Sequence, residues 1–594
     1  MLTAIDSPEF SRALDELEEQ TGQPREQLIK EARSCLAEMA ARPTSLAVAG
    51  WDKFCRWLAR AYKLDVDDEA IEQLKVLARD ATLIFLPNHR SYLDPLVLHS
   101  ALERHDFPPN HVLGGANLAI WPLAGIGQRS GLVFIRREFK NAPVYRAVLR
   151  AYLSSLLKSR TNLEWYIEGG RTRTGKLRPP RYGVLSYVID AFAEDPENDV
   201  FLIPTSVIYD QQHEVGAISA EEMGGAKSPE SLGWLYNFAK SQSRRLGRAH
   251  LRFGEPLALR SAIALTEDEN GRPRPRLAVA KVAFEVCNRI NNATPVTPTA
   301  LVTFALLDND DRAITVGEGA EILRPLLQYI QVRELPVTGD VDLSGSIELP
   351  DAVNALVREG VVTRHDGGTE PVFVIPRDQQ LAAAFYRNTI IHFFITRAIV
   401  EVALLGALES GADDISSATW ASAKRLKDLL KFEFFFPRTR EFAEAVAEEA
   451  RIVDPDWQLD ADSTVSVRQL FESMRLFVAP RVIAPFLEAY LVVADRLADH
   501  DPESPIDQDA LIEQCFGVGQ QWWLQRKLHS PESISKDLFR NALKLADNFG
   551  LMGTGGQDLR DRRCALADEL RELVRRVRAI RKLSRSRWEA EVDV

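Results

Sequence analysis

Residues 82–94 read T-L-I-F-L-P-N-H-R-S-Y-L-D, an apolar run that passes into a polar turn. Five consecutive apolar or β-branched residues bounded by turn-forming residues are typical of a buried strand. Pro95 follows directly, and proline is favoured at the first position of a helix. The order of strand, polar turn and helix predicts one unit of an α/β layer fold.

The same alternation continues along the chain from this stretch. Apolar runs at 132–135, 163–167, 200–203 and 250–253 predict further strands, and residues 142–158 predict a helix between two of them. Strands that alternate with helices favour a parallel sheet. We therefore predict an α/β domain over residues 76–295, with a mixed, largely parallel sheet flanked by helices.

The chain on both sides of this domain is predicted to be helical. Apolar residues recur at helical spacing before residue 75, which predicts an N-terminal helical region over 1–75. After about residue 295 strand-forming runs become rare, apart from 371–375, and we predict a mainly helical domain over 296–594. A chain of 594 residues is long enough for two or three domains.

The composition is that of a folded protein in a reducing compartment. Hydrophobic residues make up 45% and charged residues 27%. The five cysteines are far apart and form no C-x-x-C pair, which argues against a disulfide framework or a zinc site. The N-terminus does not read as a signal peptide, and no apolar window is long enough to predict a membrane span.

Positive charge is concentrated in two segments of an acidic chain. The net charge is −12, yet residues 131–181 hold twelve basic and three acidic residues, and residues 571–587 hold eight and one. Such segments predict anionic partners. A nucleic acid is not the expected partner, because the segments lack interleaved aromatic residues and a recognisable binding module.

The turn after the first strand contains the first candidate for catalysis. His89 and Asp94 are separated by four residues, so a turn can bring the carboxylate to one ring nitrogen and leave the other nitrogen free. A general base requires this arrangement. The alternative is that Asp94 caps the helix that begins near Pro95 and that His89 is an ordinary loop residue.

Basic residues follow two other predicted strands. Arg136 and Arg137 end the run 132–135, with Lys140 just beyond, and guanidinium groups match phosphate oxygens in bidentate geometry. A solvated strand end with surface ion pairs is the alternative.

Residues 166–176 read Y-I-E-G-G-R-T-R-T-G-K, a strand that enters a glycine-rich basic turn. Paired glycines allow close approach of the backbone to a ligand, and Arg171, Arg173 and Lys176 can surround an anion. The spacing is not that of a P-loop. The alternative is a basic surface loop. The fourth segment, residues 203–208, reads as a strand with a proline at position 204 and indicates no function by itself.

Taken together and in this order, the four segments resemble the motif blocks of the glycerolipid acyltransferases, specifically the bacterial glycerol-3-phosphate acyltransferases with an H-x4-D motif. Further similarity lies at Tyr209 and at residues 214–216, 254–256 and 385–392. The resemblance covers about 80–260 strongly and the helical remainder loosely. Thr172 departs from the serine that the family more often has, but it keeps the hydroxyl.

The resemblance implies an acyltransferase catalytic domain at 76–295 and a role for each site residue. His89 would take the proton of the glycerol hydroxyl as it attacks a thioester, acyl-CoA or acyl carrier protein, and Asp94 would hold the imidazole. No serine or cysteine nucleophile, metal or redox cofactor is implied. Glu168 would bind a glycerol hydroxyl or orient an arginine. The expected substrate-binding residues are Arg136, Arg137, Lys140, Glu168, Gly169, Gly170, Arg171, Thr172, Arg173 and Pro204.

The acylated product is amphipathic, so we expect a peripheral protein on the cytoplasmic face of the cell membrane, in contact with an anionic surface. Residues 566–583 form an apolar helical stripe beside the basic residues of 571–587, a pattern of interfacial helices. Residues 432–436, with four phenylalanines, are a second candidate. In both cases the alternative is packing against the protein core.

Other functions remain open at this level. Dihydroxyacetone phosphate is the nearest alternative acceptor, and lysophosphatidic acid is less favoured because the block around Glu168 resembles that of the first-step enzymes. A catalytically inactive membrane-binding scaffold is the alternative outside enzymes, and the intact His89 and Asp94 pair argues against it.

Overall fold

The computed structural model of the chain forms two compact units. The first contains Met1–Thr172, Leu177–Gln212 and Ser228–Thr294, and the second contains Arg173–Lys176, His213–Lys227 and Pro295–Val594. The prediction of three regions, 1–75, 76–295 and 296–594, stays a prediction. The residues that the structure describes are 4–115, 123–136, 142–194, 198–212, 214–222, 246–264, 275–307, 309, 312–341, 349–453 and 464–592.

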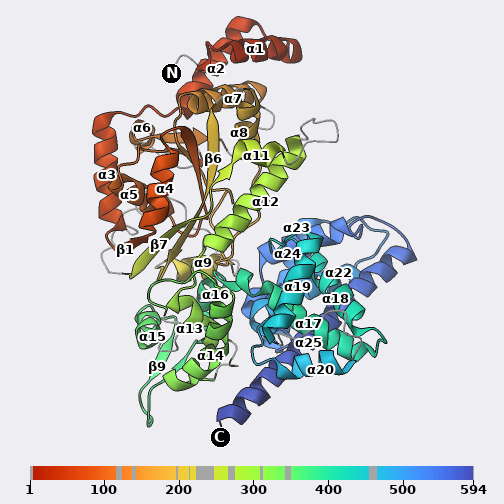
Figure 1. Cartoon of the computed structure of the whole chain (residues 1–594). Helices are drawn as coiled ribbons and strands as arrows, with labels where there is room; N and C mark the ends of the chain where they lie inside the picture. Colours follow the sequence, from red (N-terminus) through yellow and green to blue (C-terminus); the bar gives the residue numbers. More distant parts are fainter. Residues whose placement is uncertain are drawn as a thin grey trace. The chain divides into compact units, whose positions relative to one another are not determined.

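A mixed sheet forms the centre of the first unit (Figure 1). Its strand order is β1-β7-β6-β2-β5-β3-β4, and neighbouring strands are parallel except that β7 and the short β8 run antiparallel to β6. The predicted fold class is thereby confirmed. The strands are β1 (Lys63–Val66), β2 (Ala81–Pro87), β3 (His111–Gly115), β4 (Leu132–Ile135), β5 (Leu163–Glu164), β6 (Asp199–Tyr209), β7 (Arg248–Phe253) and β8 (Leu257–Ala258).

Helices cover both faces of this sheet. Figure 1 shows α3 (Ser45–Ala59), α4 (Asp68–Leu77) and α5 (Asp94–Arg104) on one side and α12 (Pro275–Ala293) on the other. Every residue of β2 is buried, as its apolar sequence predicts for a central strand covered on both faces. The remaining helices described in this unit are α1 (Pro8–Thr21), α2 (Arg25–Met39), α6 (Leu123–Arg129), α7 (Pro143–Lys158), α8 (Gly183–Glu194) and α11 (Leu259–Ala264).

The strand predictions at 82–86, 132–135, 200–203 and 250–253 are confirmed by β2, β4, β6 and β7. The run 163–167 forms only two strand residues, because the chain then leaves the sheet to form the glycine-rich turn. The short strands β1 and β3 were not predicted, since neither has a long apolar run.

The second unit is mainly helical and contains the hairpin of β9 (Thr363–His365) and β10 (Val372–Val374). The prediction of a strand at 371–375 is confirmed. Among the helices of the described chain, none combines the length and apolarity that crossing a membrane requires. The helices of this unit are α9 (Val215–Glu222), α13 (Pro298–Leu306), α14 (Val316–Val332), α15 (Leu349–Arg358), η3 (Arg377–Gln379), α16 (Gln380–Arg387), η4 (Ile391–Phe393), α17 (Ile395–Ser410), α18 (Ile415–Leu430), α19 (Thr439–Val453), α20 (Thr464–Ser473), α21 (Ala479–Val482), α22 (Ala484–Asp499), α23 (Gln508–Leu524), η5 (Pro531–Ser533), α24 (Lys536–Asn548) and α25 (Gln557–Val592).

The interpretation of the 566–583 stripe as a membrane-facing surface is wrong for most of its length. Its residues from Leu566 to Ile580 are buried in the core of the second unit, where α25 packs against α22 and α17, and Leu583 is partly exposed. Core packing also accounts for residues 432–436, since Phe434 and Phe436 are buried and their rings contact Phe486 and Phe442. Contact with a membrane through another surface stays a prediction.

Candidate active site

The polar turn between β2 and α5 is fixed to the sheet by Asn88, the residue that precedes His89. Its backbone N–H donates to Thr205 O at 3.0 Å, and its buried side chain exchanges hydrogen bonds with the backbone of Val207 at 2.8 and 3.3 Å. Asn88 therefore extends the β2–β6 pairing through its side chain. The sequence analysis missed this role, because only the strand pairing identifies its partners.

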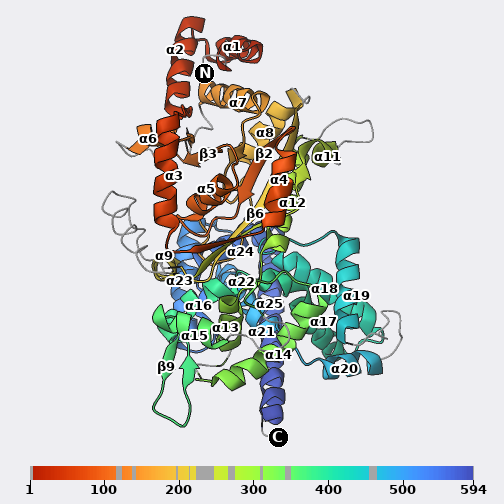
Figure 2. The same cartoon turned by 60° about the vertical axis from the view of Figure 1, so that its left-hand side comes forward.

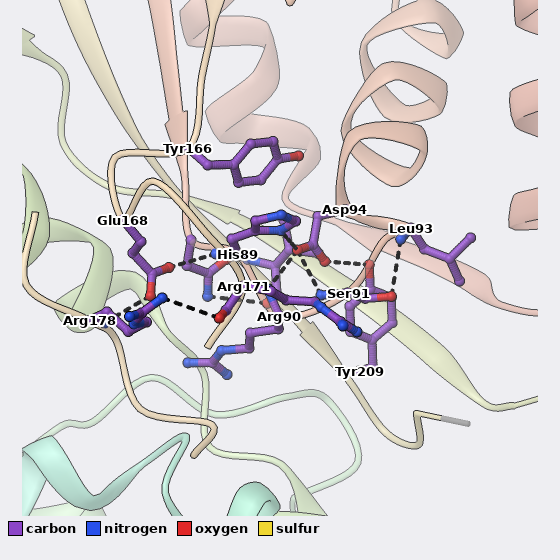
Figure 3. Close-up of polar contacts among 12 residues, drawn as sticks. His89, Arg90, Ser91, Leu93, Asp94, Tyr166, Glu168, Arg171, Arg178 and Tyr209 are labelled. Atoms are coloured by element: carbon purple, nitrogen blue, oxygen red, sulfur yellow. Dashed lines mark hydrogen bonds and ion pairs between the residues drawn. The ribbon is translucent and has the colours of Figure 1, made fainter. Parts of the chain in front are cut away.

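His89 and Asp94 form the pair that the spacing predicts. His89 Nδ1 lies 3.0 Å from Asp94 Oδ2, and Tyr209 donates its hydroxyl to Asp94 Oδ1 at 2.7 Å (Figure 3). An ionised carboxylate only accepts, so Nδ1 carries the proton and Nε2 is left to accept one. The His89 side chain is 19% exposed and Asp94 is fully buried.

Asp94 does not cap α5, the alternative considered from the sequence. Its Oδ2 instead accepts from the backbone N–H groups of Arg90 and Ser91, at 2.7 and 2.9 Å, within the turn that precedes the helix. The carboxylate thus holds the turn and the imidazole together.

Glu168 connects the glycine-rich loop to the backbone of His89. Its Oε1 accepts from His89 N at 2.6 Å and its Oε2 accepts from Arg178 N at 2.8 Å, while Thr172 N donates to His89 O at 2.8 Å (Figure 3). Burial raises the pKa of Glu168 to about 7, against the opposing effect of the two backbone donors. These contacts make Glu168 a positioning residue for His89, a role that the sequence analysis did not foresee; its contact with substrate stays a prediction.

Gly169 is required by the conformation of this loop, whereas Gly170 is not constrained in the same way. Gly169 has a φ of +66°, and a Cβ there would lie 2.6 Å from Arg181 Cγ. A Cβ at Gly170 would meet Arg178 Nη1 at an ordinary 3.4 Å. The first glycine therefore permits a left-handed turn that brings Arg171 and Thr172 back to His89.

Two aromatic rings line the pair and the adjacent arginine. The Tyr166 ring lies over the His89 ring, with centroids 4.2 Å apart, and the Arg171 guanidinium lies 4.0 Å from the centre of the Tyr92 ring. Figure 3 shows Arg171 close to the turn that carries His89. A guanidinium stacked on an aromatic face keeps its positive charge, so Arg171 places a cation beside the turn of His89.

Arg90 is a further charged residue of the turn that the sequence analysis did not single out. Its side chain is buried, burial lowers its pKa to about 10, and its Nε and Nη1 have no hydrogen-bond partner among the described residues. Its place between His89 and Ser91 was the one sequence signal that could have identified it.

Arg136 lies at the end of β4, apart from this cluster. β4 is the third strand from β2 in the sheet, so their ends are about 14 Å apart at the usual strand spacing. Arg136 forms a bidentate pair with Glu38, at 2.9 and 2.5 Å, and stacks on Tyr145. Arg137 and Lys140, predicted to bind substrate with it, lie outside the described residues.

The second half of the glycine-rich loop belongs to the second unit. Arg173–Lys176 packs there, and Lys176 Nζ lies 2.6 Å from Oε2 of the buried Glu433. The expectation that Lys176 helps to surround an anion is therefore wrong, because a carboxylate already neutralises it. At Gly175 a Cβ would lie 1.9 Å from Phe385 O, so this glycine allows the segment to pack closely.

Pro204, the remaining predicted residue, lies on β6. It is opposite Leu86 of β2, and its carbonyl accepts from Gly254 N at 2.8 Å. These contacts support the strand beside the His89 turn. Of the predicted residues, the structure thus brings together His89, Asp94, Glu168, Arg171 and Thr172.

Comparisons with known proteins agree on one type of enzyme. A family model described as "Glycerol-3-phosphate acyltransferase C-terminal region" matches residues 219–555, and one described as "Acyltransferase" matches residues 68–208. Proteins of Mycobacterium bovis and Mycobacterium tuberculosis, each named "Putative acyltransferase plsB1", are 43% identical over 586 residues, which is 98% of this chain and 94% of each relative.

More distant similarity extends to two other bacteria. A Glaesserella parasuis protein named "Glycerol-3-phosphate acyltransferase" is 28% identical over 553 residues, 90% of this chain and 66% of that protein. The crystal structure of PlsC, the 1-acyl-sn-glycerophosphate (LPA) acyltransferase of Thermotoga maritima, resembles 40% of this chain and 79% of that chain, with 14% identity and a TM-score of 0.24.

Proposed function

Because the chain belongs to the glycerol-3-phosphate acyltransferase family, we propose that it moves a fatty acyl group from acyl-CoA or acyl carrier protein to the sn-1 hydroxyl of glycerol 3-phosphate. The product is lysophosphatidic acid, and the reaction is the first step of phospholipid synthesis. The protein acts as a peripheral enzyme at the cytoplasmic face of the membrane, where its acylated product can leave.

The observation that supports this proposal most strongly is the His89–Asp94 pair held by the glycine-rich loop. The histidine presents one nitrogen to a buried carboxylate, and its backbone is bound on both sides by Glu168 and Thr172. A base fixed in this way needs little reorganisation before it accepts a proton.

In the proposed reaction His89 Nε2 removes the proton of the sn-1 hydroxyl as the oxygen attacks the thioester carbonyl carbon. Asp94 stabilises the imidazolium that forms. The tetrahedral intermediate then collapses, the carbon–sulfur bond breaks, and the imidazolium returns its proton to the leaving thiolate. Since the thioester is already activated, alignment and one base supply most of what the transfer requires.

Basic residues bind the acceptor phosphate in this proposal. Arg171 has the best placement among the described residues, because its guanidinium lies beside the turn of His89. Arg136, Arg137, Lys140 and Arg173 are the other candidates, and Arg136 would have to exchange Glu38 for the phosphate. Bidentate arginine contacts give both affinity and orientation for a phosphate monoester.

An acceptor assay tests the proposed function. Purified protein is incubated with an acyl-CoA and, separately, with glycerol 3-phosphate, dihydroxyacetone phosphate or lysophosphatidic acid. We expect acylation of glycerol 3-phosphate with the highest kcat/KM. Preferred acylation of either other acceptor would reassign the substrate, and no acylation of any acceptor would favour an inactive membrane-binding scaffold.

A further inference from the structure

The second unit contains a cavity of about 620 Å³ that the proposed reaction does not use. Residues of α16, α21, α22, α23 and α25 line it, together with the segment that joins α23 to η5; Figure 2 labels these helices. A volume of this size lies within the range of cavities that hold small organic ligands.

Positive charge dominates the wall of this cavity. Among the described residues, eight of the nineteen that line it are arginine or lysine, and Glu532 is the single acidic one. Arg578, Arg581, Lys582 and Arg585 share one face of α25, since they lie at positions i, i+3, i+4 and i+7. Like charges at this spacing destabilise a helix, so their concentration on one face indicates a site for an anion.

The remainder of the wall is largely apolar. Leu307, Pro480, Pro485, Trp523 and Leu528 contribute to it, and Leu524 lines it while 77% exposed. Cations beside an aromatic and aliphatic surface fit a ligand that has a phosphate group joined to an apolar or aromatic portion. A free inorganic ion would contact the cations and leave the apolar part of the wall unused.

The wall is also connected to the glycine-rich loop by hydrogen bonds within the second unit. Arg387 and Glu532 both line the cavity, with Arg387 Nη2 lying 2.6 Å from Glu532 Oε1. The buried Asn388 donates to the same carboxylate oxygen at 3.0 Å and to Thr174 O at 2.9 Å. Thr174 belongs to the segment that continues directly from Arg171 and Thr172 along the chain.

We propose that this cavity binds a phosphate-bearing amphiphile and that its occupancy is transmitted to residues 173–176. The ligand is either a soluble nucleotide phosphate, such as the nucleotide end of a thioester donor, or the phosphate headgroup of a membrane lipid. Binding itself does not depend on the proposed function. The proposed function matters only for a further expectation, that occupancy of the cavity changes the rate of acyl transfer through the loop.

The test compares two double variants of α25 that remove the same charge. Lys582→Gln/Arg585→Gln removes two cations of the cavity wall, and Arg560→Gln/Arg571→Gln removes two exposed arginines of the same helix outside it. Both are made in an Arg171→Ala background, so that the proposed acceptor site does not contribute. Thermal denaturation checks that both remain folded.

The soluble source is tested with adenosine 3′,5′-bisphosphate by isothermal titration calorimetry. The headgroup source is tested by co-sedimentation with phosphatidylcholine vesicles that contain phosphatidic acid, against pure phosphatidylcholine. We expect one of these two interactions to weaken about tenfold or more in the cavity variant and to change little in the control variant. Equal binding by the two variants, or no binding of either probe to the parent protein, would overturn the proposal.

Amide hydrogen exchange tests the connection to the loop without an activity measurement. In the parent protein, the probe that binds should slow exchange in the peptide that contains residues 173–176. The cavity variant should lose this effect. Unchanged exchange in that peptide at saturating probe would show that the cavity is not coupled to the loop.

Discussion

The two basic segments, 131–181 and 571–587, have similar net charge in the sequence and serve different purposes in the structure. In the first, the Arg171 guanidinium stacks on the Tyr92 ring beside the His89 turn, and Arg136 and Lys176 form ion pairs with Glu38 and Glu433. In the second, part of the charge on α25 is paired with acidic residues such as Glu409, and part lines a cavity. A basic segment therefore predicts that anionic groups lie nearby, but it does not show whether these groups belong to a ligand or to acidic side chains of the protein.

Two histidine–aspartate pairs of the first unit can be compared in the same way, one at the proposed active site and one outside it. Loss of the aspartate at the active site should give the largest effect on kcat. Asp94→Asn should lower kcat by about 10²–10⁴-fold, because the imidazole loses the charge that supports its protonated form. Asp52→Asn is a matched control, since Asp52 Oδ1 lies 2.7 Å from Nε2 of His99 in the same unit, outside the loop contacts. Steady-state kinetics should show a near-normal kcat for the control. A similar loss in both variants would mean that the effect is structural.

Removal of a paired cation should affect stability rather than catalysis. Lys176→Met leaves the buried Glu433 with Tyr490 and Asn541 as its side-chain partners within the described part of the chain, so we expect a loss of about 3–5 kcal/mol in the free energy of unfolding. Lys536→Met is the control, because its pair with Glu513 has the same 2.6 Å separation but is partly exposed and should cost no more than about 1 kcal/mol. Denaturant unfolding measures both. Equal losses would show that burial of the Glu433 pair adds nothing.

Removal of the stacked cation should affect the acceptor. Arg171→Ala should raise KM for glycerol 3-phosphate by roughly 10–100-fold, the value of a charge-assisted hydrogen bond, and leave KM for the acyl donor nearly unchanged. Equal effects on both substrates would assign Arg171 to the donor or to a structural role.

Arg136 gives a second test of the acceptor site, because its guanidinium is paired with the carboxylate of Glu38. If Arg136 leaves Glu38 for the acceptor phosphate, Arg136→Ala raises the same KM and Glu38→Gln lowers it. No change in either variant would remove Arg136 from the acceptor site.

For the fully buried His250 we expect a smaller, pH-dependent effect on stability. Burial lowers the pKa of His250, but its hydrogen bonds to Asp210 and Asp65 outweigh burial, and the pKa is raised. Its contribution to stability should therefore be complete below the unfolded value of about 6.5 and be lost as pH rises through the folded pKa. Melting temperatures of wild type and His250→Gln, measured from pH 6 to 9, should converge as pH rises. A constant difference would contradict the raised pKa.

Much of the fold and the centre of the site could be predicted from the sequence. The strands β2, β4, β6 and β7 follow from apolar runs. The spacing of His89 and Asp94 within one turn allows their pairing, and the order of the motif blocks favours that pairing over a helix cap. Each of these strands lies within one short segment, so the sequence of that segment is enough to predict it.

Features that depend on distant partners could not be predicted. The roles of Asn88 and Glu168 depend on backbone groups of Val207 and Arg178, and the stripe of α25 has the same periodicity whether it faces a membrane or α22. Lys176 is the clearest case, since its partner Glu433 is 257 residues away in the chain. A sequence motif shows which residue types are present, but the tertiary fold decides which of them remain available to a ligand.

Product analysis of wild type and His89→Ala tests the central claim, that the His89–Asp94 site acylates glycerol 3-phosphate. Each protein is incubated with glycerol 3-phosphate and a mixture of acyl-CoA species, and the products are identified and timed by mass spectrometry. We predict lysophosphatidic acid acylated at the sn-1 position from the wild type, and formation at least about 100-fold slower from a folded His89→Ala variant. Retention of more than about a tenth of the wild-type rate by that variant, or acylation at another position, would contradict the claim.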